Sequence, residues 1–291
     1  MNHARSNLSL LALLLATMLV TSCAGTRPEP AATMTPASTS TAAITPIPTR
    51  IDLSPDLYLR QIREDVFVVT HAFPWPANSL IVEMSNGDLV LVGTPYTPAA
   101  TDQVLDWITE HFGQRKIIEI NTGYHVDNLG GNSALIARGI PVYGSDLTVK
   151  LLKERGETTR QLLMKMLGPA DQAYYQPQSE IPYLPPNQLF PIEAGLKLQF
   201  GDEQLQVFYP GPSQAPDKVV VYFPAKKLLF GSCLILGGEK IGNTSDADME
   251  HWPAAVHSLE QFPVEIVVPG HGERLDPGLI KHTLDLLSAQ P

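Results

Sequence analysis

One short segment of this 291-residue chain combines a strand, a metal-binding pattern and a sharp turn. Residues 121–132 read Asn-Thr-Gly-Tyr-His-Val-Asp-Asn-Leu-Gly-Gly-Asn, which places His125 and Asp127 two positions apart. The segment follows an apolar run at 116–120 that predicts a β-strand, and a helix and a second strand are predicted within 134–143. This order predicts a loop at the carboxyl end of a strand, where α/β proteins usually carry their sites.

The rest of the chain also alternates strands and helices. Before the loop, apolar and β-branched runs predict strands at 66–70, 80–84 and 89–92 and a helix at 101–112. After it, the same signals predict helices at 147–167, 252–261 and 277–287, a proline-rich connection at 168–191, and strands at 196–200, 205–209, 219–223, 228–230 and 266–268. About 240 residues of this kind are acceptable for one α/β domain.

Later segments supply further side chains that can bind metals. Cys233 stands in the run Gly-Ser-Cys-Leu-Ile, and His271 stands in the turn Pro-Gly-His-Gly. Between them lies Gly-Asn-Thr-Ser-Asp-Ala-Asp at 242–248. The chain has two cysteines, Cys23 and Cys233, and a cysteine without a disulfide partner is a buried bystander, a reactive liability or a metal ligand.

The loop at 121–132 resembles the His-x-His-x-Asp loop of the metallo-β-lactamases, with Gly123 at the position of the first histidine. The run 209–221 is similar to the family segment that carries the third histidine, and Gln214 occupies that position. The cysteine segment, the following loop and the last histidine turn then come in the family's order. The resemblance covers residues 58–287 and implies an α/β fold, the αββα sandwich of two mixed β-sheets flanked by helices.

By this resemblance the family's two metal sites differ in this chain. The three-histidine site maps to Gly123, His125 and Gln214, so two of its three imidazoles are absent. The second site maps to Asp127, Cys233 and His271, and all three of its ligands are present. Three protein ligands and one open position are typical of a catalytic zinc. The resemblance, which is closest to the cysteine-containing dizinc and mono-zinc subclasses, therefore implies one zinc ion.

A zinc bound by a carboxylate and a thiolate is formally neutral, and it acidifies its bound water less than a zinc on three neutral histidines, where that water has a pKa of roughly 7. His125, without a metal to coordinate, is then the candidate general base, and Asp127 is the competing one. The resemblance places Asn243, Gln214 and Trp75 on the substrate side. Leu236 stands where the family has a cation for the substrate carboxylate.

The expected function is a zinc-dependent hydrolase that opens the β-lactam amide. One alternative is a hydrolase of the same fold that acts on another cyclic ester, amide or thioester. The other is a metal-binding lipoprotein without catalysis, which the combination of Gly123, Gln214 and Gly93 favours, since Gly93 replaces a family aspartate near the metal. Asp246 and Asp248 are expected only to cap the helix near Trp252.

The N-terminus predicts export. Residues 1–22 contain Arg5 and then a short apolar run, as in a signal peptide, and end before Cys23 in a sequence similar to a bacterial lipoprotein box. Residues 23–50 are rich in Pro, Thr, Ser and Ala and predict a flexible tether, so the domain is expected to span 51–291. The sequence thus predicts a lipoprotein that Cys23 anchors to a membrane, facing the periplasm or another extracytoplasmic space.

The net charge of -10 and the absence of clustered lysines and arginines argue against nucleic acid as a partner. The expected partner is a small-molecule substrate, and the expected state is a monomer.

Overall fold

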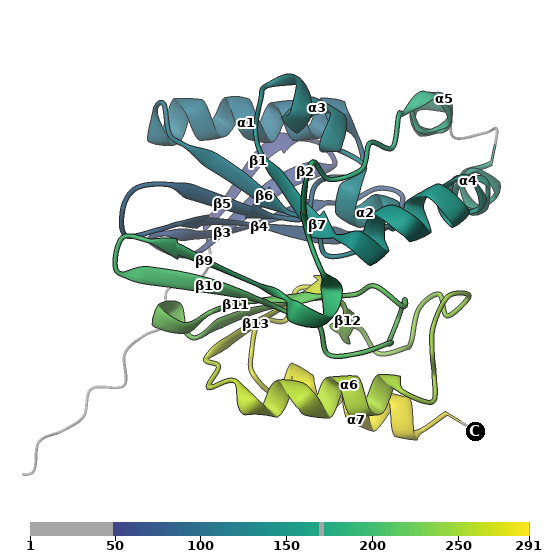
Figure 1. The fold of residues 1–291 in the computed structure, drawn as a ribbon. Coiled ribbons are helices and arrows are strands. Elements are labelled where there is room, and N and C mark those ends of the chain that lie inside the picture. Colours follow the sequence, from purple (N-terminus) through teal and green to yellow (C-terminus); the bar gives the residue numbers. More distant parts are fainter. Residues whose placement is uncertain (1–48, 169–171, 291) are drawn as a thin grey trace, which may run out of the picture. The chain divides into compact units, whose positions relative to one another are not determined.

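Two β-sheets lie face to face with helices on the outer side of each, which gives four layers (Figure 1). The computed structural model describes residues 49–168 and 172–290. The expected αββα sandwich of two mixed sheets is confirmed. The expected signal peptide, Cys23 and all but the end of the tether lie outside the described residues. In the described part of the chain, no helix has the length and apolar character needed to cross a membrane.

The first sheet has eight strands in the order of the sequence. They are β1 (Thr49–Ser54), β2 (Leu57–Arg63), β3 (Val66–His71), β4 (Ala77–Glu83), β5 (Leu89–Val92), β6 (Ile117–Ile120), β7 (Val142–Ser145) and β8 (Gln188–Phe190). Strands β1 to β5 pair antiparallel, and β5 to β8 pair parallel. The parallel half carries the loop at 121–132 at the carboxyl end of β6.

The second sheet has the order β13-β12-β11-β10-β9. Its strands are β9 (Leu196–Phe200), β10 (Glu203–Phe208), β11 (Val220–Phe223), β12 (Leu228–Leu236) and β13 (Ile266–His271). Only the β12–β13 pair is parallel. The α-helices are α1 (Pro98–Phe112), α2 (Val126–Leu129), α3 (Asn132–Ala137), α4 (Asp146–Leu167), α5 (Gln172–Glu180), α6 (Trp252–His257) and α7 (Leu279–Ser288), and short 3-10 turns lie at Ile192–Ala194, Pro224–Lys226 and Ser258–Gln261.

The central strands of each sheet are buried on both faces, because the sheets cover each other on the inner side and helices cover the outer side, and neighbouring residues of a strand point to opposite sides. In β3, Val68 packs between the two sheets while Phe67 packs under α1. In β11, Val221 faces the space between the sheets, and Val220 faces Trp252 of α6. Strands covered on both sides read as continuous apolar runs, which is why their positions could be predicted.

Three parts of the fold differ from the sequence-based expectation. Strands β1 and β2 were not predicted, and the proline-rich connection contains α5 and β8. The strand expected at 228–230 continues to Leu236. Its pairing with β13 shifts register around Ser232, which has a φ of 51°, and the Gly231-Ser232 pair makes this stretch look like a loop in the sequence. This irregular strand is the one that positions Cys233.

Candidate metal centre

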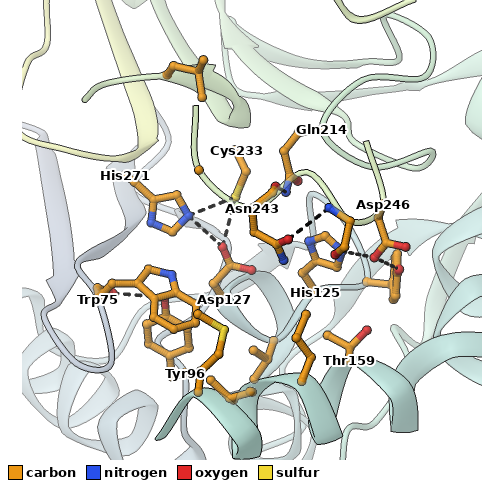
Figure 2. A pocket seen from close by; sticks show the side chains of 18 of the residues that line it. Trp75, Tyr96, His125, Asp127, Thr159, Gln214, Cys233, Asn243, Asp246 and His271 are labelled. Carbon is orange, nitrogen blue, oxygen red and sulfur yellow. Dashed lines mark hydrogen bonds and ion pairs between the residues drawn. The ribbon is translucent and has the colours of Figure 1, made fainter. Parts of the chain in front are cut away.

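A cavity of about 680 Å³ opens at the edge where the loops after β3, β6, β12 and β13 meet (Figure 2). Its lining includes Trp75, His125 and Asn243, which the sequence placed at the substrate side or in catalysis. Trp75 stands edge-on to Tyr96, with ring centroids 6.2 Å apart, and both line the cavity. All the side chains discussed below lie around this cavity or directly behind its wall.

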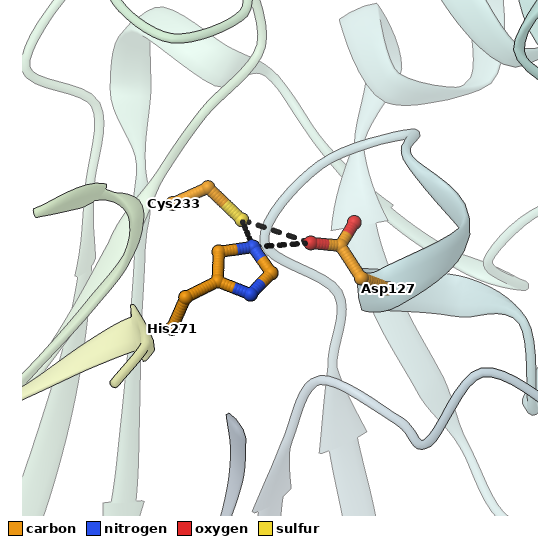
Figure 3. Close-up of side chains that lie close together, drawn as sticks. All are labelled: Asp127, Cys233 and His271. Atoms are coloured by element: carbon orange, nitrogen blue, oxygen red, sulfur yellow. Dashed lines mark hydrogen bonds and ion pairs between the residues drawn. The ribbon is translucent and has the colours of Figure 1, made fainter. Parts of the chain in front are cut away.

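Three elements bring Asp127, Cys233 and His271 together at the floor of the cavity (Figure 3). Asp127 lies in the first turn of α2, Cys233 within β12 and His271 at the end of β13. The Cys233 Sγ lies 3.0 Å from Asp127 Oδ2 and 3.5 Å from His271 Nε2, and these two atoms are 3.2 Å apart. Three ligand atoms of one tetrahedral zinc lie about 3.3–3.7 Å from one another. The donor set and its spacing therefore fit a zinc ion.

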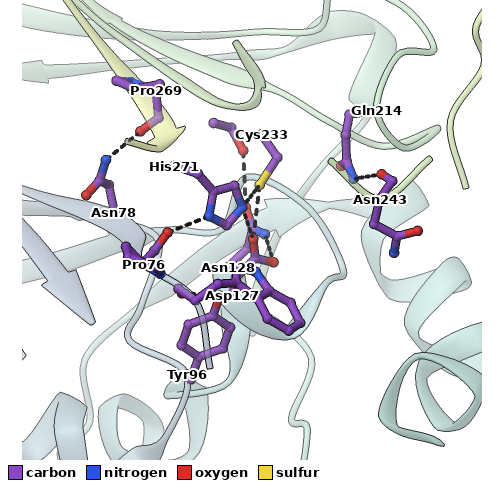
Figure 4. A network of polar contacts seen from close by, with 12 residues as sticks. Pro76, Asn78, Tyr96, Asp127, Asn128, Gln214, Cys233, Asn243, Pro269 and His271 are labelled. Atoms are coloured by element: carbon purple, nitrogen blue, oxygen red, sulfur yellow. Dashed lines mark hydrogen bonds and ion pairs between the residues drawn. The ribbon is translucent and has the colours of Figure 1, made fainter. Parts of the chain in front are cut away.

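Neighbouring groups orient these three donors (Figure 4). The Nδ1–H of His271 donates to the carbonyl of Pro76 at 2.7 Å, which directs Nε2 toward the other two donors. The Asn128 amide donates to Asp127 Oδ1 at 2.7 Å, and its own carbonyl oxygen accepts from Thr122 Oγ1 at 2.5 Å. Pro76 and Asn128 thus orient two of the three donors, and Thr122 in turn holds Asn128.

Charges within the triad are coupled. Burial alone would raise the pKa of Asp127, but the hydrogen bond from His271 and the charge of Lys218 hold it far below its ordinary value. Burial alone would lower the pKa of His271, but the Cys233 and Asp127 side chains raise it well above that value. The site therefore favours a cation between these groups, and a bound metal would displace protons from it.

His125 lies apart from the triad and pairs with Asp246. Its Nε2 is 3.0 Å from Asp246 Oδ2, which also accepts a hydrogen bond from the Tyr124 hydroxyl at 2.5 Å. Arg155 lies 3.5 Å from the other carboxylate oxygen. These partners, above all the His125 hydrogen bond, lower the pKa of Asp246 to about 2.

The expectation that Asp246 is only a helix cap was wrong. Asp248 lies just before the start of α6, where its Oδ1 accepts from the backbone N–H of His251, the residue before the helix, at 3.0 Å. Asp246 instead crosses to the loop after β6, because the 242–248 segment folds over the cavity. Sequence patterns near α6 could not distinguish the two aspartates.

The remaining positions of the three-histidine set offer no imidazole. Gly123 has no side chain, and Gln214 donates from Nε2 to the backbone carbonyl of Asn243 at 3.3 Å. The side chain of Lys218 packs beside Gly123 and is fully buried. Lys218, Asp246 and Arg155 are the functional candidates that sequence reasoning missed, and a lysine beside an apolar strand, in Asp-Lys-Val-Val-Val, was the available signal.

Comparisons with known proteins agree with this geometry. The sequence profile of the Metallo-beta-lactamase superfamily matches residues 72–271. A Metallo-beta-lactamase type 2 of Pseudomonas aeruginosa is 32% identical over 236 residues, which cover 79% of this chain and 83% of the relative. One of Bacillus sp. (strain 170) is 31% identical over 216 residues, 73% of each chain. The solved metallo-beta-lactamase from Pontibacter korlensis superimposes with a TM-score of 0.67 at 31% identity, covering 80% of this chain and all of that one.

Proposed function

Because the chain belongs to the metallo-β-lactamase superfamily, we propose that it is a hydrolase that opens the amide ring of β-lactams with a single zinc ion held by Asp127, Cys233 and His271. The family implies a divalent metal, typically zinc. The observation that carries the proposal is the convergence of these three donors at the floor of a substrate-sized cavity. A bound zinc would act there as a Lewis acid toward the scissile amide.

His125 is the general base in this proposal. With Nε2–H donating to Asp246, the imidazole keeps its Nδ1 lone pair free to take a proton from an attacking water. The ionised Asp246 carboxylate stabilises the imidazolium that forms. Asp127, the competing base, is less suited, since its Oδ2 faces Cys233 and His271 and its Oδ1 accepts from Asn128.

The cavity walls favour a partly apolar substrate. Helix α4 contributes Leu162 and Met166, which are 37% and 55% exposed, and Trp75 lies on another wall. Leu236 lines the cavity where the family carries its cation, and Lys240 lies nearby on the same rim. Asn243 is exposed at the mouth, where its side chain can contact a substrate carbonyl. Gln214 also lines the cavity, but its amide nitrogen already binds Asn243.

The test is metal content and turnover of the purified protein with a penicillin and a carbapenem. We expect one equivalent of zinc and hydrolysis that stops when a chelator removes the metal and returns when zinc is added. Less than half an equivalent of zinc after zinc loading would refute the metal centre, and one equivalent without lactam turnover would refute the β-lactam substrate.

A second candidate is a hydrolase of another cyclic ester, amide or thioester. The apolar Leu236 at the position of the family's cation favours it, because an uncharged substrate needs no such partner. One zinc with turnover of lactones or thioesters, but not of β-lactams, would select this function. One zinc without turnover of either panel would select the non-catalytic metal-binding protein that Gly123 and Gln214 favour.

We further propose that the enzyme is an exported monomeric lipoprotein, anchored through Cys23, that acts on small molecules outside the cytoplasm and does not bind nucleic acid. The signal-like N-terminus and the acidic net charge support this. The Cys23→Ser variant should move from the membrane fraction to the soluble exported fraction. Unchanged membrane association would contradict the anchor.

A further inference from the structure

A buried lysine takes the space that the first histidine of the family's three-histidine site would occupy. A Cβ atom built on Gly123 would lie 3.0 Å from Lys218 Nζ and 3.1 Å from its Cδ. The backbone N–H of Val219 donates to the Thr122 carbonyl at 3.1 Å, which fixes the lysine beside the glycine. Any side chain at position 123 would therefore meet the Lys218 ammonium first.

This lysine has no ordinary structural partner in the part of the chain that the structure describes. Lys218 is 0% exposed, and its Nζ makes no hydrogen bond there. Asp217, the residue before Lys218, accepts a hydrogen bond from the Thr148 hydroxyl through Oδ2. Its Oδ1 would lie 3.3 Å from a Cβ atom built on Gly123. A buried charge without a direct partner is costly, so its retention calls for compensation by charges nearby.

That compensation comes from the acidic groups of the site. Burial would lower the pKa of Lys218, but the Cys233, Asp127, Asp217 and Asp246 side chains raise it above its ordinary value. The ammonium therefore carries a fixed single positive charge among groups that would otherwise attract a cation. Lys226 offers a contrast, because it is also buried but pairs directly with Asp65 and Glu203 away from the cavity.

We propose that Lys218 limits the centre to one metal ion: its ammonium fills the space of the missing imidazole at position 123 and puts a fixed positive charge where a second metal would otherwise be favoured. This inference rests on the proposed single-zinc centre at Asp127, Cys233 and His271. Lys218 acts through its charge and its volume and does not touch the substrate, since it lies behind the cavity wall and does not line the cavity. Gly123 thus leaves the space of a histidine ligand open, and Lys218 fills that space with a positive charge.

The test restores the lost histidines with and without the lysine. Metal content by native mass spectrometry and the absorption spectrum of the cobalt-loaded protein are measured for Gly123→His/Gln214→His and for the same variant with Lys218→Ala, which removes both the charge and the side-chain atoms beside position 123. We expect one metal in the first variant and two in the second, with the cobalt–thiolate band of Cys233 present in both. Two metals with Lys218 still in place, or one metal after its removal in a folded protein, would overturn the proposal.

The single variant Lys218→Met gives a second measurement that does not depend on the rebuilt site. Removing a like charge should tighten zinc binding at the Asp-Cys-His site by about tenfold in competition with a chelator, an effect typical of residues outside the ligand set. Lys226→Met is the matched control, and its zinc affinity should equal that of the wild type. Wild-type protein without zinc would refute the proposed function, whereas one wild-type zinc with unchanged affinity in Lys218→Met would refute only the role of Lys218.

Discussion

The two halves of the centre differ in the side chains that they offer to a metal. On one side, Asp127, Cys233 and His271 converge with donor atoms 3.0–3.5 Å apart and carry the groups needed to bind a metal. On the other side, Gly123 and Gln214 supply no imidazole, and a lysine fills the space beside the glycine. In the proposed single-zinc centre, the first half holds the metal, and in the second half the Lys218 ammonium takes the place of a metal ion.

The difference bears on His125, which the family resemblance maps to the three-histidine site. His125 keeps its place in the loop but pairs with Asp246, and this pair rather than a metal orients the imidazole. A histidine on a carboxylate is a base, whereas a histidine on a metal is not. In the proposed single-zinc centre, His125 is therefore a group able to move protons beside the metal.

The largest loss of zinc affinity and turnover is expected from a substitution in the Asp127, Cys233 and His271 half. Cys233→Ser removes the thiolate ligand, so zinc affinity should fall by more than the roughly 10–100-fold that loss of an outer partner costs, and turnover should disappear with the metal. A chelator competition assay measures the affinity. Unchanged stoichiometry and affinity would mean that the triad is not the zinc site.

A smaller loss of turnover, without loss of zinc, is expected from a substitution of His125 in the other half. His125→Gln should lower kcat by roughly 100-fold, the lower end for loss of a general acid or base, while zinc content stays at one equivalent. Gln keeps a polar side chain of similar reach but cannot take a proton at neutral pH. Loss of zinc together with activity would instead make His125 a ligand and would remove the contrast between the halves.

The smallest effect is expected for Asp246 and concerns the pH dependence of the free energy of unfolding. Its folded-state pKa of about 2 lies below the ordinary 3.8, so the carboxylate stabilises the fold above about pH 4, and this contribution is lost as the pH falls toward 2. At ~1.4 kcal/mol per pKa unit, it amounts to about 2 kcal/mol. Asp246→Asn should remove this part of the pH dependence in denaturant unfolding of the metal-free protein. Parallel stability curves of the two proteins between pH 5 and 2 would contradict the pairing with His125.

Much of the fold could be predicted from local patterns. The strands at 66–70 and 89–92 are continuous apolar runs because both of their faces are buried, and this property is visible in the sequence. The extension of β12 to Leu236 could not be predicted, since Gly231 and Ser232 look like a loop and only pairing with β13 keeps them in a strand.

The candidate site divides in the same way. The resemblance of the ordered motifs to the family predicted that Asp127, Cys233 and His271 form one ligand set, and the structure brings their donor atoms together. The pairing of His125 with Asp246 joins residues 121 positions apart, and Lys218 reaches Gly123 from 95 positions away. Neither contact leaves a local pattern, because each depends on how loops of two different sheets pack at one edge. The sequence by itself determined which residues are candidate metal ligands. Only the tertiary structure placed the Lys218 ammonium beside Gly123, since a buried charge is positioned by residues distant in the chain and not by its neighbours in sequence.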